Sequence, residues 1–249
     1  MVNSIFRLKD GRDYDYLAND VASKSAILFH HGTPGDCTVW SSWISQLTSV
    51  RAVAASRPGY GLSSRRRGRN VASDIDQNSE LLDHFGIEKF VSIGWSGGGP
   101  HALNMTRHPK NKGAITLAGV GEWGNEDLDF LAGMGSENHE EFGAALAGES
   151  IIEDWMIKNS PAFKNVTGAD LISSFGGLIG DADKRALTPT VAEEDATALR
   201  RALSVSYYGW LDDDVVLQLL LIDVAHRVDE RCRHDRYACG NKLSKVLLV

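Results

Sequence analysis

The most constraining feature of the sequence is the pentapeptide Gly-Trp-Ser-Gly-Gly at residues 94–98. An apolar run at residues 89–94 leads straight into it, and a segment with helical spacing follows. A serine lifted clear of a sheet on such a sharp bend crowds the positions two residues to either side, and this crowding selects glycine there. Gly94 and Gly98 occupy those positions. The sequence therefore predicts a strand, a sharp turn with Ser96 at its tip, and a helix.

Strand-like and helical segments alternate through the first half of the chain. Four short apolar runs, ending at or near turn residues such as glycine and proline, occupy residues 25–30, 51–56, 89–94 and 113–118. Helices are expected at about residues 38–47, 74–85 and 100–107. Such alternation predicts an α/β fold, with a mostly parallel sheet and helices on both of its faces. Ligands of these sheets bind at the carboxyl ends of the strands.

The pattern changes in the second half, where acidic helix-forming segments such as residues 149–158 and 191–203 follow one another without a convincing strand. We interpret residues 122–205 as a helical cap inserted in the core. Residues 1–121 then form the α/β core with its glycine-rich loops. Residues 206–249 are interpreted as an atypical remnant of the C-terminal part of the core.

The serine on the turn suits nucleophilic attack on a carbonyl carbon, which generates an oxyanion. Preorganised backbone N–H groups must stabilise that charge. Gly97 N–H is one expected donor, and Thr33 N–H is the second, because the loop at residues 31–35 follows an earlier strand. The motif-supporting residues are His31, Gly32, Gly35, Gly94 and Gly98. We assign His30 and His31 to loop structure, since a base there would lie on the oxyanion side of the substrate.

Three segments, HGTPG, RPGYGLSS and GWSGGGPHAL, resemble corresponding segments of the α/β-hydrolase family that carries an HGxPG motif. This family includes proline iminopeptidase-like and esterase-like enzymes. The resemblance extends over about residues 26–120 and implies an α/β-hydrolase fold with Ser96 as nucleophile. It disfavours the related dehalogenases and epoxide hydrolases, whose nucleophile is aspartate. It does not indicate a substrate.

A serine nucleophile needs a histidine to accept its proton and an acid to orient that histidine, in the chain order Ser, Asp, His. In the family that the chain resembles, the acid follows a late strand and the histidine lies on a loop after the last strand. Asp235 is the best candidate acid on that basis, and Glu122 ranks below it. No histidine is identified as the base. The poor substitutes are His84, His101, His108, His139, His226 and His234.

The sequence after about Asp214 departs from the family. Residues 215–228 are apolar all round, with little amphipathic order, and an arginine- and cysteine-bearing stretch follows. The one later strand-like run, residues 246–249, ends the chain. Our hypothesis is that the family's sequence has been replaced beyond Asp214, through truncation, a gene-model error or a shifted reading frame. Sequencing the transcript tests it.

Composition narrows the partners and the compartment. A formal charge of −7 gives no general attraction to nucleic acid or to anionic membranes, and the basic run Arg65–Arg69 reads as a solvated loop without a role. Three cysteines, Cys37, Cys232 and Cys239, are too few and uneven for a disulfide scaffold and suit a reducing cytosol. We expect a soluble cytoplasmic protein with a small-molecule substrate and neither metal nor cofactor. The oligomeric state stays open.

These observations predict a serine hydrolase that acts on a small ester or amide through an acyl-enzyme on Ser96, impaired by the loss of the C-terminal histidine. The alternative is a catalytically inactive relative that binds a small molecule or a partner in the same pocket.

Overall fold

The computed structural model describes residues 3–121, 123–124, 128–216 and 246–248. Seven strands form one sheet in the order β1-β2-β4-β3-β5-β6-β7. The strands are β1 (Ser4–Arg7), β2 (Asp13–Ala18), β3 (Ser25–His30), β4 (Arg51–Ala55), β5 (Lys89–Trp95), β6 (Asn111–Leu117) and β7 (Val246–Leu248). Strands β4, β3, β5, β6 and β7 run parallel, whereas β1 and β2 add an antiparallel edge. The predicted mostly parallel α/β sheet is confirmed.

The antiparallel edge was not predicted. Strand β2 lacks a simple alternation of buried and exposed residues, because the consecutive residues Tyr14 and Asp15 are both buried. Asp15 accepts a hydrogen bond from the Ser56 hydroxyl at 3.1 Å, which replaces part of the water that the carboxylate loses. A charged residue inside a strand hides the period of two on which a sequence-based strand prediction depends.

Helices cover both faces of the sheet. The bounds are η1 (Cys37–Trp40), α1 (Ser41–Gln46), η2 (Val71–Ser73), α2 (Asp74–His84), α3 (Gly98–Asn104) and η3 (Met105–Arg107), where η marks a 3-10 helix. Leu28 packs in one buried cluster with Leu81 of α2, and its neighbour Phe29 packs in another with Ile44 of α1. Successive strand residues point to opposite faces, so both faces are buried and the strands read as continuous apolar runs.

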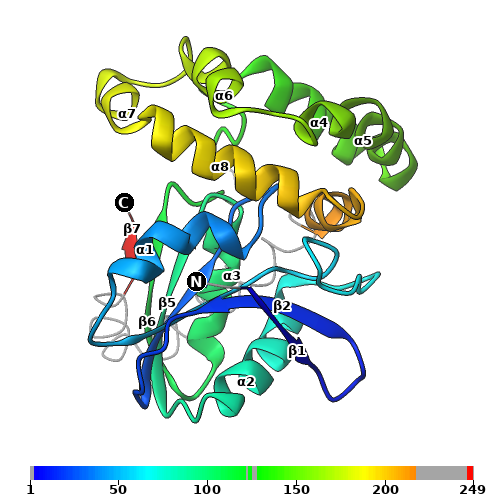
Figure 1. The fold of residues 1–249 in the computed structure, drawn as a ribbon. Helices are drawn as coiled ribbons and strands as arrows, with labels where there is room; N and C mark the ends of the chain where they lie inside the picture. The colour runs from blue at the N-terminus through cyan, green and yellow to red at the C-terminus, as the bar shows by residue number, and fades with distance from the viewer. Residues whose placement is uncertain (1–2, 122, 125–127, 217–245, 249) are drawn as a thin grey trace.

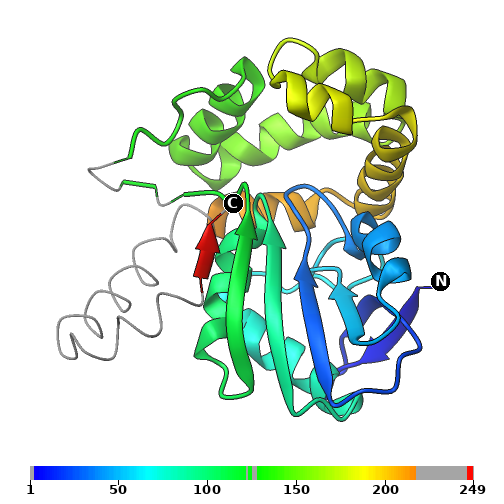
Figure 2. The same cartoon turned by 90° about the vertical axis from the view of Figure 1, so that its left-hand side faces the viewer.

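A second layer of helices lies over the carboxyl ends of the parallel strands (Figures 1 and 2). It consists of α4 (Ser136–Ala147), α5 (Glu149–Phe163), α6 (Gly168–Phe175), α7 (Asp181–Ala186) and α8 (Pro189–Ala202). We call it the helical layer. A further helical stretch, residues 208–216, packs Trp210 against the layer's Ile152 and Met156 and against Tyr60 of the core.

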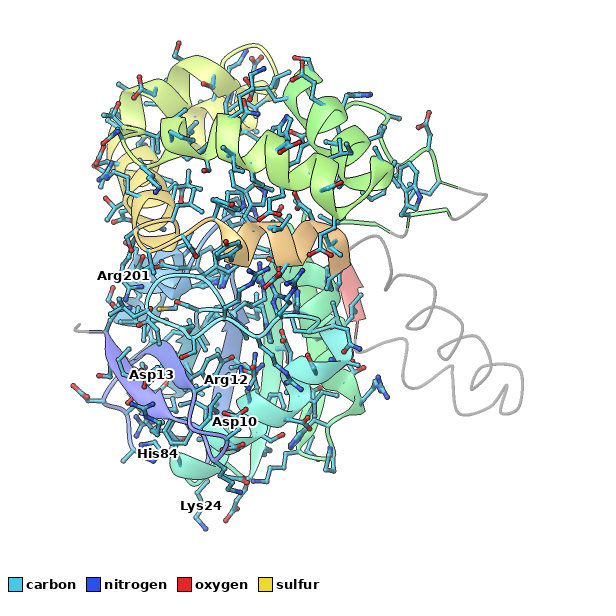
Figure 3. The ribbon with its side chains drawn as sticks, turned by 90° about the vertical axis from the view of Figure 1, so that its right-hand side faces the viewer. Asp10, Arg12, Asp13, Lys24, His84 and Arg201 are labelled. Carbon is cyan, nitrogen blue, oxygen red and sulfur yellow. The ribbon has the colours of Figure 1, made fainter. Side chains whose placement is uncertain are left out.

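Arg201, near the end of α8, joins the helical layer to the core (Figure 3). Its guanidinium contacts the Asp15 carboxylate at 2.7 Å and also pairs with Asp36. Both carboxylates are buried, so the arginine supplies the charge that they need.

Strand β7 lies beside β6 at the edge of the sheet (Figure 2). Asp235 precedes β7 in the chain and, like Glu122, lies outside the described residues. Within the described ranges, every helix is too short or too polar to cross a bilayer.

Candidate active site

The turn between β5 and α3 holds Ser96 in a left-handed backbone conformation, with φ of +52°. Such a φ is uncommon for a residue other than glycine and needs support from its surroundings. The Ser96 N–H donates to the carbonyl of Leu117 at 3.0 Å, and the Ser96 carbonyl accepts from Gly99 N–H at 2.9 Å and Val120 N–H at 3.2 Å. The last residue of β6 and the segment that follows it therefore hold both backbone groups of Ser96.

The glycines on either side of Ser96 are required by close backbone approach. A Cβ built on Gly94 would lie 2.1 Å from the carbonyl oxygen of Gly98. One built on Gly98 would lie 2.4 Å from the carbonyl oxygen of His30 and 2.6 Å from that of His31. These are backbone atoms, which cannot rotate away as the end of a side chain can. The steric reason that selects glycine at both positions in the sequence is therefore visible in the structure.

The loop that follows β3 packs directly against this turn. The register places His30 opposite Gly94, so the carboxyl ends of β3 and β5 are level. A Cβ built on Gly32 would lie 3.4 Å from Ser96 Cβ, and one built on Gly97 would lie 3.2 Å from the backbone nitrogen of Thr33. The structure thus brings Ser96, Gly97 and Thr33 together.

His31 hydrogen bonds both within its loop and to the segment that follows β4. Its Nε2 accepts from the Arg57 N–H at 2.9 Å, and its Nδ1 lies 2.8 Å from the carbonyl oxygen of Gly32, so this hydrogen-bond pattern assigns the proton to Nδ1. Burial, and then the charge of Arg57, lower the pKa of His31 well below its usual value. With Nδ1 engaged by its own loop and Nε2 by the Arg57 N–H, His31 is neutral and holds the loop's shape. Gly35 closes the loop over Gly32, where a Cβ would lie 3.2 Å from the Gly32 carbonyl oxygen.

A buried ionic cluster, absent from the sequence prediction, lies behind the loop. Its centre is Asp213, which is 0% exposed. Asp213 accepts hydrogen bonds from Tyr60 Oη at 2.9 Å, from Arg57 Nη2 at 2.6 Å and from Arg69 Nη2. Although burial alone raises the pKa of a carboxyl group, Arg57 and Arg69 hold that of Asp213 well below its usual range. We call these four residues the Asp213 cluster.

The cluster corrects the interpretation of Arg65–Arg69 as a solvated loop. The Arg69 side chain is 0% exposed and pairs with Asp213. Arg65 pairs with Asp212 at 2.7 Å and lies over the ring of Tyr208. The arginines Arg66 and Arg67 are half-buried and exposed, respectively. The sequence feature that could have revealed this cluster is the run of three aspartates at 212–214. Such a run close to a tryptophan is unusual, and it offers negative charges that buried arginines could pair with.

The other histidines of the described ranges include His30, His101 and His139. His101 of α3 has its Nδ1 2.5 Å from the Asp74 carboxylate, and both side chains are buried. Burial, and then His101, lower the pKa of His30 to about 3. His139 is exposed on α4. His226 and His234, like the candidate acids Asp235 and Glu122, lie outside the described residues. Within the described ranges, no histidine is hydrogen bonded to Ser96, and no group of three or more His, Cys, Asp or Glu side chains is arranged to hold a metal ion.

The comparison with known protein families supports the resemblance seen in the motifs. The family described as the alpha/beta hydrolase fold matches residues 25–144. An uncharacterized hydrolase of Bacillus subtilis (strain 168), YcgS, is 34% identical over 103 residues, which are 39% of this chain and 36% of that protein. The chain therefore spans little more than a third of the curated relative that it matches.

Solved structures with a similar fold come from several organisms. A hydrolase from Pseudomonas aeruginosa PA01 has a TM-score of 0.58 at 18% identity, covering 87% of this chain and 72% of its own. A carboxylesterase structure from Nitrososphaera gargenis has a TM-score of 0.58 at 16% identity, covering 99% and 88%. The epoxide hydrolase VrEH1 from Vigna radiata has a TM-score of 0.56 at 17% identity, covering 90% and 74%. At these identities the likeness is one of fold.

Proposed function

From the α/β-hydrolase fold of this chain, we propose that it is a serine hydrolase of small esters or amides, with Ser96 as the nucleophile. The observation that carries the proposal is the positive φ of Ser96 on a turn whose flanking glycines are both required sterically. Strained backbone conformations of this kind concentrate at functional sites. In an α/β-hydrolase fold the nucleophile is carried on such a strand-to-helix turn, which lifts its hydroxyl above the sheet.

In the first step, Ser96 Oγ bonds to the carbonyl carbon of the substrate, its hydroxyl proton passes to solvent water, and the carbonyl π electrons move to the carbonyl oxygen. The N–H groups of Thr33 and Gly97 stabilise the resulting oxyanion. The tetrahedral intermediate then expels the alcohol or amine, which takes up the released proton from water, and leaves an acyl group on Ser96. Water hydrolyses that ester and restores the hydroxyl.

Each of the three parts of the chain has its own proposed role. We assign residues 1–121 to the core that carries Ser96, residues 122–205 to a cap over that core, and residues 206–249 to an atypical remnant of the C-terminal part of the core. Trp95, beside the nucleophile, is 38% exposed and packs against Gly32. An aromatic surface at that place favours a substrate with an apolar group next to its carbonyl.

Hydrolysis of a short-chain nitrophenyl ester tests this function. Wild type should release nitrophenolate, and Ser96→Ala should reduce the rate to the background hydrolysis. Ser173→Ala, which changes an exposed serine of α6, is the matched control and should behave as wild type. Turnover that survives in Ser96→Ala would show that the nucleophile lies elsewhere.

The alternative function is a catalytically inactive relative that binds a small molecule or a partner in the same pocket. The engagement of His31 within its loop and of His101 with Asp74 favours this alternative, since neither histidine serves Ser96. It predicts that wild type and Ser96→Ala are equally inert, while the ester still quenches the fluorescence of the exposed Trp95.

A further inference from the structure

The side chain of Thr33 is held from two directions. Its hydroxyl donates to Asp213 Oδ2 at 2.8 Å and accepts from Arg57 Nη2 at 2.9 Å. A hydroxyl that both donates and accepts to buried partners has a fixed rotation. Thr33 also carries one of the two proposed oxyanion donors, so the rigidity of its side chain bears on the geometry of that donor.

Arg57 binds the peptide unit that contains this donor. Its Nη2 donates to the Gly32 carbonyl oxygen at 2.8 Å, and its Nη1 donates to the carbonyl oxygen of His31. The Gly32 carbonyl and the Thr33 N–H belong to one planar peptide group, and in its trans form they point in opposite directions. With the carbonyl turned to Arg57, the Thr33 N–H points away from Arg57. A Cβ built on Gly97 would lie close to the Thr33 nitrogen, which places the turn beside Ser96 next to this peptide group.

The same contact polarises the donor. A cationic guanidinium on the carbonyl oxygen withdraws electron density from the peptide group and makes its N–H a stronger donor. Arg57 is 2% exposed, so water screens this effect little. The Asp213 cluster fixes the arginine, because Asp213 Oδ2 binds Arg57 Nη2 at 2.6 Å and Nε at 3.1 Å.

We propose that Arg57, held by Asp213, is a positioning residue that orients and polarises the Thr33 oxyanion donor. This inference rests on the proposed function of Ser96. Arg57 touches neither the substrate nor the reacting atoms in this account, and it acts through the Gly32–Thr33 peptide group. Asp213 belongs to the helical stretch at residues 208–216. A segment that is remote in the sequence therefore fixes the conformation of the loop at residues 31–35.

Arg57→Lys and Thr33→Val test the inference by steady-state hydrolysis of a short-chain nitrophenyl ester. Lysine keeps the charge but cannot present the fork that spans Asp213 and two carbonyl oxygens. The expected result for Arg57→Lys is a fall in kcat of between about 10-fold and 100-fold, with KM within about twofold of wild type, because a misaligned donor acts in the transition state. Thr33→Val should lower kcat by about tenfold, and Thr33→Ser, which restores the hydroxyl, should recover most of the loss.

The matched control is Arg67→Lys, which changes an exposed arginine of the same basic run and should leave both parameters unchanged. If Arg57→Lys does not fold, Thr33→Val against Thr33→Ser decides the question. An active wild type whose kcat is unaffected by these changes, or whose KM alone changes, overturns the inference and leaves the proposed function standing. If wild type shows no turnover, or shows turnover that does not depend on Ser96, both the inference and the proposed function are overturned.

Discussion

Replacing Asp213 with asparagine removes the one negative charge that binds both buried arginines Arg57 and Arg69. The carboxylate accepts hydrogen bonds from both guanidinium groups, from Tyr60 Oη and from the Thr33 hydroxyl. Asparagine offers a single acceptor oxygen in their place, and its amide nitrogen faces donors. Removing one partner of a buried ion pair costs about 3–5 kcal/mol, against about 5–15 kcal/mol for the free energy of unfolding of a typical domain.

The loss should depend on pH in a defined direction. The folded-state pKa of Asp213 is held well below its unfolded value. Its stabilising contribution is therefore fully present above the unfolded value, near pH 4, and is lost as pH falls through the folded value. The difference between wild type and Asp213→Asn should be constant from pH 7 to pH 5. Between pH 4 and pH 3 it should shrink by about 1 kcal/mol.

Urea unfolding followed by tryptophan fluorescence measures these differences. Asp212→Asn is the matched control, because the neighbouring Asp212 pairs with Arg65, whose side chain is 26% exposed. It should cost less than Asp213→Asn, because Arg65, when it loses its partner, still reaches water. The reasoning is refuted if Asp213→Asn destabilises no more than Asp212→Asn at pH 7, or if its effect grows as the pH falls below 4.

Two further predictions concern the turn and the helical layer. Gly94→Ala places a Cβ 2.1 Å from a backbone oxygen and should lower the free energy of unfolding by about 3 kcal/mol. A Cβ built on Gly143 meets no atom within 4 Å, so Gly143→Ala should raise the free energy of unfolding by about 0.5–1 kcal/mol in the same assay. Burial, and then Glu194, raise the pKa of Asp195 from 3.8 to about 6, so its contribution to stability is lost as pH rises through 6. The Tm of Asp195→Asn relative to wild type should therefore increase between pH 4.5 and pH 7.5, and a constant difference contradicts this.

The sequence predicted the turn and the parallel strands because each depends on local pattern. The apolar run predicted at residues 25–30 is β3, and Gly94 and Gly98 follow from the steric demands of one bend. The match to the alpha/beta hydrolase fold over residues 25–144 confirms the fold that the motifs indicated. Such local features can be predicted without knowing which distant residues contact them.

The Asp213 cluster could not be predicted in that way. Arg69 and Asp213 are 144 positions apart, and charged residues in a glycine-rich stretch ordinarily face water. Only the fold brings the arginine and the aspartate together. The roles of Thr33, Gly97 and Ser96 stay predictions, although the structure brings the three residues together. The acid Asp235 stays a prediction outside the described residues.

The most direct test of the central claim is the site of covalent labelling by a fluorophosphonate probe. Intact-protein mass spectrometry should show one adduct, and peptide mapping should place it on Ser96. Ser96→Ala should carry no adduct under the same conditions, while Ser173→Ala should be labelled as wild type is. An unlabelled wild type, or an adduct that persists in Ser96→Ala, would contradict the assignment of Ser96 as the nucleophile.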